Sequence, residues 1–327
     1  MARRGRRKGN GGSLLLAAVV AMVLLALAVA GGWWLGRQAA QDETGVAAVA
    51  PDATGVDTAA VNGASAAAAP ANATPHRAGA AAKPAAAVPM AAQAPPDLPP
   101  AAAGAHLAVI LDDCGQNLNH LDEVLALPFP VTLAIMPRQP QSLTTAQKAR
   151  AAGKPIMLHQ PMEPLAGANG TAPNPGPGAI MAATPPDQVA AVLTDNLASA
   201  GNPPGFNNHM GSRVTANQEL MRAVMQFAKN RNLFFIDSWT SGQSVAMTTA
   251  HAAGVRTARN EVFLDNQDDY AYVTERLRLA ARKAAPGAAV VAIGHITRQQ
   301  TWRVLRDAAG WLKASGIALV PAADLAR

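Results

Sequence analysis

The sequence predicts an α/β fold, a distorted (β/α) barrel of seven to eight units with parallel strands. Short apolar runs alternate with segments of helical periodicity along residues 106–327, a normal length for one α/β domain. Strands and helices in series imply right-handed crossovers and therefore a parallel sheet. Most of the apolar runs end at a polar or charged residue, and such barrels carry their functional groups at the carboxyl ends of their strands.

The elements of the first half follow one another in regular order. The first strand, 106–111, is an apolar run that ends at Asp112-Asp113-Cys114-Gly115, where two carboxylates precede a glycine turn. Further strands are predicted at 131–135 and 154–158, and helices at 118–126, 143–152 and 185–200. A loop rich in Gly, Pro and Asn covers 164–184, and loops of this length in a compact domain are usually functional or mobile.

The second half continues the same alternation. Strands are predicted at 205–209, 233–236, 255–257 with 262–264, 288–293 and 317–320, and helices at 216–230, 243–252, 268–284 and 299–314. The strands are rich in branched and aromatic apolar residues, whereas the helices carry their apolar residues on one face. A helix therefore returns the chain from the end of one strand to the start of the next.

A basic cytoplasmic terminus, 1–12, precedes an apolar segment at 13–36 that carries no charge. The segment is long enough to cross a hydrocarbon core of about 30 Å as a helix. The basic residues hold the amino terminus in the cytoplasm, and Trp33-Trp34 suits the far interface. Ala28-Val29-Ala30 fits the cleavage site of a signal peptide, but the length favours an uncleaved anchor. Either alternative exports the rest of the chain, anchored at the periplasmic face of the inner membrane or released into the periplasm.

Residues 37–105 form a linker dominated by Ala, Pro, Gly and Thr, which cannot bury enough apolar surface to offset the entropy of ordering. We expect a tether without fixed structure. The net charge of +6 belongs mostly to the terminus, and the other basic residues nearly balance the 21 acidic ones. The terminal basic residues are Arg3, Arg4, Arg6, Arg7 and Lys8. We therefore expect no nucleic-acid partner, and the single cysteine, Cys114, excludes an intramolecular disulfide.

Histidine and aspartate side chains stand at the ends of most predicted strands. They are Asp112, Asp113, His159, His209, Asp237, Asp265 and His295. Because a parallel barrel gathers the carboxyl ends of its strands at one face, we expect these side chains to converge. Imidazoles and carboxylates are ligands for zinc or a similar divalent cation, and three such ligands with one open position are typical of a catalytic site.

Simpler structural roles compete at single positions. Asp112 and Asp113 point to opposite sides of a regular strand and would then take two roles, or they cap backbone N–H groups in an Asx-type turn. Asp265 is placed to cap the helix at 268. Trp239 is suited to stack on a sugar ring or to pack in the core.

Six short stretches of residues 106–325 carry a family resemblance. They are ILDDCG at 110–115, MLHQPMEP at 157–164, PGPGAI at 175–180, GFNNHMGS at 205–212, FFIDS at 234–238 and AIGH at 292–295. Together these stretches resemble the polysaccharide deacetylase superfamily, in particular its divergent branch of exported bacterial proteins. The resemblance implies a distorted (β/α) barrel that removes acetyl groups from N-acetylated sugars with a divalent metal, preferably zinc.

The resemblance also implies roles for individual residues. In this superfamily the first aspartate of the pair is the general base, which is Asp112 here, and the second, Asp113, binds the metal. His295 stands in the place of the general acid. Asp237 matches the aspartate that orients the catalytic groups.

The chain departs from the superfamily in its metal motif. The usual motif has two histidines four residues apart, whereas His159 is followed at that spacing by Glu163. Either Glu163 binds the metal as a carboxylate or His209 supplies the missing imidazole, and we prefer His209 because the GFNNHMGS stretch has no better explanation. Glu163 would then hold a ligand histidine in place. The arginine motif of the fourth strand is missing unless Arg213 substitutes for it.

We therefore expect a zinc-dependent hydrolase at the periplasmic face of the inner membrane that deacetylates an N-acetylated glycan of the cell envelope. Its membrane partner is the bilayer, through the amino-terminal helix. The altered metal motif keeps an alternative open, a non-catalytic envelope protein that retains the barrel and the metal to bind a glycan or another partner. A third hypothesis is an esterase of small acetylated compounds.

Overall fold

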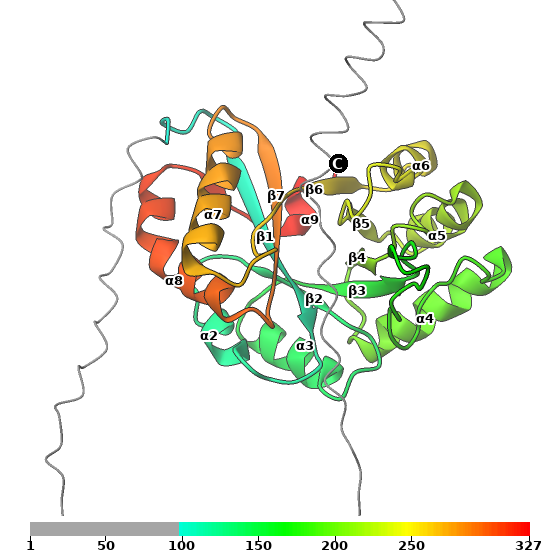
Figure 1. Cartoon of the computed structure of the whole chain (residues 1–327). Helices are drawn as coiled ribbons and strands as arrows, with labels where there is room; N and C mark the ends of the chain where they lie inside the picture. The colour runs from blue at the N-terminus through cyan, green and yellow to red at the C-terminus, as the bar shows by residue number, and fades with distance from the viewer. Residues whose placement is uncertain (1–97) are drawn as a thin grey trace, which may run out of the picture. The chain divides into compact units, whose positions relative to one another are not determined.

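The computed structural model describes residues 98–327 (Figure 1). The predicted basic terminus, the predicted anchor and nearly all of the predicted linker lie outside the described residues. Among the helices of residues 98–327, none has the length and apolar character that a membrane crossing requires.

Eight parallel strands form one sheet. They are β1 (His106–Cys114), β2 (Thr132–Ile135), β3 (Ile156–Met162), β4 (Gly205–Met210), β5 (Phe234–Asp237), β6 (Thr257–Phe263), β7 (Ala289–His295) and β8 (Ala318–Leu319). Strands β2 to β7 pair in chain order, β7 pairs with β1, and β1 pairs with β2, which closes a barrel of seven strands. The short β8 pairs only with the start of β1. This arrangement confirms the predicted barrel.

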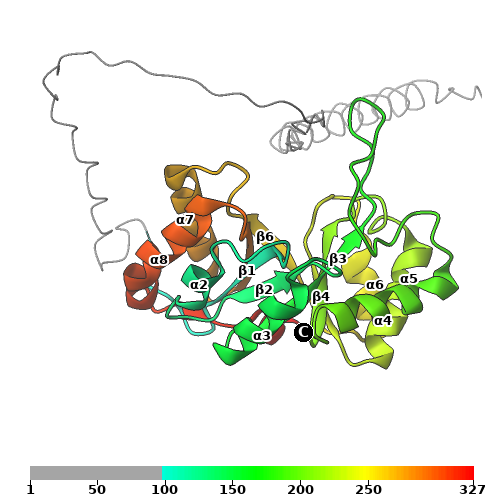
Figure 2. The same ribbon diagram turned by 90° about the horizontal axis from the view of Figure 1, so that it is seen from below.

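The helices connect successive strands, and most of them surround the barrel (Figures 1 and 2). They are α2 (Leu121–Leu125), α3 (Ser142–Ala151), α4 (Val189–Ser199), α5 (Gln218–Asn230), α6 (Ala246–Ala253), α7 (Tyr270–Ala284), α8 (Gln299–Ala314) and α9 (Ala322–Leu325), with a 3₁₀ turn η1 (Pro186–Gln188) before α4. The apolar face of each outer helix packs against the barrel, as its periodicity predicted.

The buried apolar side chains form two layers. Strand β1 contributes alternate residues to them, Leu107 and Val109 to the layer under the helices and Ala108 and Ile110 to the layer inside the barrel. This alternation follows from the strand geometry, in which successive side chains point to opposite sides. Asp112 continues the inward row of Ala108 and Ile110, so its carboxylate reaches the interior at the end of the barrel where β1 finishes.

The short helix α9 was not predicted, and it closes the other end of the barrel. Ala322 and Leu325 pack into the inner apolar layer. The amide of Ala322 donates a hydrogen bond of 3.0 Å to the hydroxyl of Thr132, the first residue of β2. The amino ends of the strands are therefore sealed with apolar groups, which leaves the carboxyl ends for polar side chains.

Several strands are longer than the apolar runs that predicted them. Strands β1, β3 and β7 continue through polar residues, because backbone pairing in the ladder does not require apolar side chains. The two short runs at 255–257 and 262–264 belong to a single strand, β6, whose register shifts between Asn260 and Val262. These extensions matter for function, because the polar residues thereby acquire the fixed positions of strand residues.

Candidate active site

Asp113, His159 and His209 form a compact group at the carboxyl ends of β1, β3 and β4. Oδ1 of Asp113 lies 3.4 Å from Nε2 of His159 and 3.2 Å from Nδ1 of His209. The two imidazole nitrogens are 3.1 Å apart. A tetrahedral zinc ion with bonds of about 2.0–2.1 Å would hold its ligand atoms about 3.3 Å apart. The three atoms therefore have the mutual spacing of ligands to one cation.

A bulge in β1 brings both aspartates of the pair to this site. The register between β1 and β2 shifts between Leu111 and Cys114, and Asp113 has a φ of 61°. In a regular strand Asp112 and Asp113 would point to opposite sides. With the bulge, both carboxylates approach Nε2 of His159, at 3.6 Å from Asp112 and 3.4 Å from Asp113. The left-handed backbone of Asp113 is thus the local feature that places two carboxylates on one cation site.

Oδ1 of Asp113 is a direct indication that the site suits a cation. This oxygen is buried and accepts no hydrogen bond, although it is surrounded by nitrogen atoms. Burial opposes its charge, but His159 and His209 outweigh burial and hold the pKa of Asp113 well below its usual range. An ionised buried oxygen whose two nitrogen neighbours lie at 3.2 and 3.4 Å without a well-formed hydrogen bond is costly unless a cation or a further donor satisfies it. The residues present therefore fit a divalent metal.

Asn207 on β4 orients His159, and the sequence did not single it out. Its Oδ1 lies 2.8 Å from Nδ1 of His159, while its Nδ2 donates a hydrogen bond of 2.9 Å to Oδ1 of Asp112. Because the amide nitrogen faces Asp112, the amide oxygen accepts a hydrogen bond from Nδ1–H of His159, and the lone pair of Nε2 is directed toward the cation site. The feature of the sequence that could have identified Asn207 is its position two residues before His209, because residues two apart lie on one side of a strand.

Asp112 lies beside the group and is almost completely buried. Burial raises the pKa of its carboxyl, and the nearby His159, His295 and Asn207 offset only part of that effect. One oxygen is bound to Asn207, and the other is directed toward His159 without a short hydrogen bond. A carboxylate with a raised pKa and one unengaged oxygen is suited to accept a proton.

His295, the last residue of β7, pairs with Asp112 in the ladder, and Asp265 holds its imidazole. Nδ1 of His295 lies 2.8 Å from Oδ1 of Asp265, and its backbone amide donates a hydrogen bond of 2.6 Å to Oδ2. Burial alone would lower the pKa of His295, but Asp265, Asp113 and Asp112 raise it to about 9. His295 is therefore protonated at neutral pH and is suited to donate a proton.

Asp265 does not cap the helix that follows it. The N-cap of α7 is Asp269, whose side chain accepts a hydrogen bond of 2.8 Å from the amide of Tyr272. Asp265 is buried, and its Oδ2 accepts a further hydrogen bond of 2.6 Å from the hydroxyl of Thr301. Its contacts therefore hold His295 in one orientation.

Asp237 lies on the outer side of the barrel wall. Phe234 and Ile236 belong to the inner apolar layer, so the alternation of β5 directs Asp237 outward. Its carboxylate accepts hydrogen bonds of 2.7 Å from the Ser244 hydroxyl and 2.8 Å from the Trp239 amide. Burial raises the pKa of Asp237, and these donors offset it in part. These contacts fix the loop after β5.

The contacts of Asp237 and Asp265 therefore differ in kind. In the described part of the chain, it is Asp265 that hydrogen-bonds to His295, and the partners of Asp237 belong to its own loop. The orienting role that the resemblance implies for Asp237 stays a prediction. The ring of Trp239 has the guanidinium of Arg259 over one face, 4.5 Å from the ring centre, which leaves only the other face for a ligand.

Glu163 lies near the site but faces a loop. One carboxylate oxygen pairs with Arg213 at 2.8 Å, and the other accepts a hydrogen bond of 2.5 Å from the amide of Ala182. The group of cation-binding atoms within residues 98–327 comprises Asp113, His159 and His209 and does not include Glu163. The geometry favours His209 over Glu163 as the third ligand.

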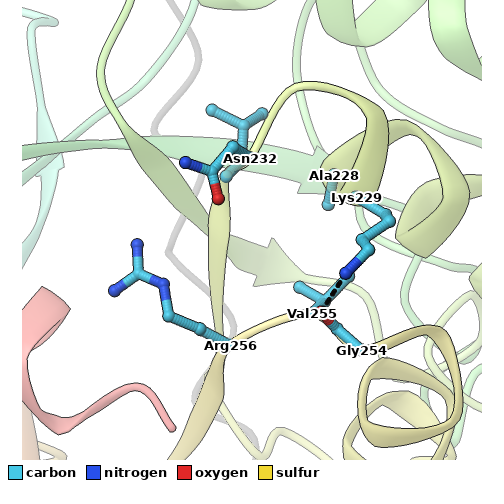
Figure 3. A pocket seen from close by; sticks show the side chains of 7 residues that line it. Ala228, Lys229, Asn232, Gly254, Val255 and Arg256 are labelled. Atoms are coloured by element: carbon cyan, nitrogen blue, oxygen red, sulfur yellow. Dashed lines mark hydrogen bonds between the residues drawn. The ribbon is translucent and has the colours of Figure 1, made fainter.

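A small cavity lies at the opposite end of the barrel, where β5 and β6 begin (Figure 3). Its volume is about 80 Å³, and Nζ of Lys229 donates a hydrogen bond of 3.0 Å to the carbonyl of Gly254 in its wall. None of the predicted site residues lines this cavity. The predicted site residues lie instead at or just beyond the carboxyl ends of the strands.

Comparison with known proteins identifies relatives over the whole barrel. A family model described as "Divergent polysaccharide deacetylase" matches residues 109–326. An uncharacterized protein of Haemophilus influenzae is 33% identical over 208 residues, which cover 62% of this chain and 71% of that protein. The uncharacterized protein YibQ of Escherichia coli K12 is 32% identical over 209 residues, 64% of this chain and 63% of that protein. The crystal structure of the uncharacterized protein ATU2773 from Agrobacterium tumefaciens C58 is 26% identical with a TM-score of 0.64, covering 68% of this chain and 90% of that one.

Proposed function

Because this chain belongs to the divergent polysaccharide deacetylase family, as its motifs predicted, we propose that it is a metal-dependent hydrolase of an N-acetylated glycan. The observation that carries the proposal is the triangle of Asp113, His159 and His209, with ligand atoms 3.1 to 3.4 Å apart. Asp112 and His295 flank this triangle as neighbours in the ladder between β1 and β7. An acceptor and a donor of protons therefore stand beside one cation site.

The triangle would hold a divalent cation, preferably zinc, through one carboxylate oxygen and two imidazole nitrogens. Bound there, the cation would polarise the acetyl carbonyl and make a water molecule more acidic. Two features of the chain suit the site to the positive charge of the cation. Asn207 fixes the tautomer of His159, and the low pKa of Asp113 keeps its carboxylate ionised.

The residues around the triangle divide the proton transfers of amide hydrolysis between them. Asp112 takes a proton from the attacking water, whose oxygen forms the new bond to the acetyl carbon. His295 gives its proton to the sugar nitrogen as the carbon–nitrogen bond breaks, so that acetate and an amine leave. Asp265 accepts a hydrogen bond from Nδ1–H of His295, which directs the other ring nitrogen toward the substrate.

We propose a location for this activity from the amino-terminal sequence. The uncharged segment at 13–36 after a basic terminus supports a domain tethered at the periplasmic face of the inner membrane. The Ala- and Pro-rich linker at 37–105 would give the domain reach. A glycan of the cell envelope is the acetylated polymer that such a domain would meet.

One experiment tests the proposal directly. Purified full-length protein is analysed for bound metal by elemental analysis and assayed for acetate release from chitooligosaccharide and from peptidoglycan fragments. We expect about one equivalent of divalent metal and release that stops after chelation. Binding of the oligosaccharide without release would select the non-catalytic alternative, and release from aryl acetates alone would select the esterase.

Replacing Asp265 with Asn is expected to shift the alkaline limb of the pH–activity profile to lower pH. The pKa of His295 is raised to about 9, so the wild-type acid stays protonated until the pH rises through that value. Without the Asp265 charge the pKa falls, by about one to three units for the loss of a close opposite charge. Profiles of kcat/KM measured from pH 5 to 10 check this, and an unchanged alkaline limb would exclude His295 as the acid.

A further inference from the structure

A long loop projects from the barrel where β3 ends. It covers residues 164–185, between Glu163 and the 3₁₀ turn η1 (Figure 2). The loop begins five residues after His159, on the strand that contributes this ligand. It therefore rises from the same end of the barrel as the candidate active site.

The first attachment of the loop is Glu163. Met162 forms a parallel bridge with Ile180, and the amide of Glu163 donates a hydrogen bond of 2.9 Å to the carbonyl of Ile180. The carbonyl of Glu163 accepts hydrogen bonds from the amides of Arg213 and Val214, at 3.2 and 3.3 Å. These last two residues follow His209 closely in the chain, so the base of the loop is tied to the segment that leaves the second ligand histidine.

The second attachment is a set of buried amides around Gly178. Its carbonyl accepts hydrogen bonds of 3.0 Å from Gln160 and 2.7 Å from Asn196, and these two side chains bond to each other at 2.8 Å. Gly178 has a φ of 74°, and a Cβ there would collide with the side chain of Asn196. This explains the second glycine of the PGPGAI stretch, and the hydrogen bonds fix the returning arm of the loop against β3 and α4.

The surface of the loop is uncharged and partly apolar. Between Glu163 and Asp187 the sequence contains no Asp, Glu, Lys, Arg or His. The side chains of Leu165 and Met181, one near each end of the loop, are 48% and 38% exposed. Leu118, in the loop after β1, is 37% exposed. Among the described residues, three of the four exposed large apolar side chains thus lie in loops that follow the strands of the ligand residues, the fourth being Leu143 on α3.

We infer that the loop 164–185 is a binding wall for sugar units of the glycan beyond the one that loses its acetyl group. This inference rests on the proposed function and adds the surface that selects the substrate. The C–H faces of neutral sugars match exposed Leu and Met side chains, and a loop without charges offers no ion-pair partner to a polyanion. The double attachment holds this wall in place before the substrate arrives, which lowers the entropic cost of binding.

The double substitution Leu165→Ser with Met181→Ser in the full-length protein tests the inference. Both side chains are partly exposed and lie in the loop outside any helix or strand, so their truncation should cost the fold little. We expect KM for chitopentaose to rise about tenfold, because the two substitutions remove part of the apolar contact area that binds the sugar. We expect kcat and the values for a single N-acetylglucosamine to remain within about twofold. Leu143→Ser, which removes an equally exposed leucine from α3, is the matched control and should change neither.

Calorimetric binding of chitopentaose separates this inference from the proposed function. If the wild type binds the pentamer without releasing acetate, the proposed function fails, and a tenfold weaker affinity of the double variant still supports the binding wall. Equal pentamer affinity and KM in wild type and double variant would overturn the inference. Equal losses for the pentamer and the single sugar would also overturn it, because the two residues would then act at the cation site.

Discussion

Replacing Asp112 with Asn is expected to lower acetate release about 100- to 10,000-fold, the usual contribution of a general base. The asparagine has the same shape, and its oxygen can still accept the hydrogen bond from Asn207 that Asp112 accepts at 2.9 Å. What the substitution removes is the charge and the basic oxygen 3.6 Å from Nε2 of His159. The cation site of Asp113, His159 and His209 keeps all its ligand atoms.

The measurement compares kcat with metal content in the same preparation. Metal should stay near the wild-type stoichiometry while kcat falls, and the binding of oligosaccharide should change little. Asp122→Asn is the matched control, because Asp122 is an exposed aspartate on α2 whose carboxylate pairs with Lys148. If Asp112→Asn released acetate at the wild-type rate, Asp112 would not be the base, whatever the metal content.

Replacing His209 with Ala is expected to weaken metal binding by at least about 100-fold. Loss of residues that merely support a ligand already costs about 10- to 100-fold in affinity, and loss of a direct ligand exceeds that. His209 supplies one of the three candidate ligand atoms, so the variant would keep only the ligand atoms of Asp113 and His159. Activity at limiting metal should fall with the metal content.

Elemental analysis and competition with a chelator measure this effect. His251→Ala is the matched control, because His251 is an exposed histidine on α6. Glu163→Gln tests the alternative ligand in the same assay. A full metal content in His209→Ala together with a loss in Glu163→Gln would reverse the ligand assignment, and we expect the opposite pattern because Glu163 is engaged with Arg213 and Ala182.

The sequence predicted those site residues that directly follow a recognisable strand. An apolar run followed by His or Asp identifies a side chain at the end of a strand, and a parallel barrel gathers these ends. Asp113, His159 and His209 came together in this way. The sequence did not identify Asn207 as a site residue, because an asparagine within a strand has no distinctive pattern. Its orienting role depends on Oδ1 lying 2.8 Å from Nδ1 of His159, a distance that only the fold sets.

The contrast between Asp237 and Asp265 shows where strand ends alone are insufficient. Both follow apolar runs, and nothing in their local sequence tells which side of the barrel wall each side chain occupies. Asp237 follows the inward-facing Ile236 and points outward, whereas Asp265 hydrogen-bonds to His295. The direction depends on the alternation of each strand and on its bulges, which pairing with neighbouring strands determines.

The sequence by itself determined that this protein is a parallel α/β barrel of the divergent polysaccharide deacetylase family, with its candidate site residues at the ends of its strands. Periodicity and short motifs are local properties, so they can be recognised without knowing the fold. Only the tertiary structure decided that a left-handed Asp113 turns two adjacent carboxylates toward one histidine, and that Glu163 serves a loop while His209 completes the triangle. Such distances between residues far apart in the chain arise only when the barrel closes.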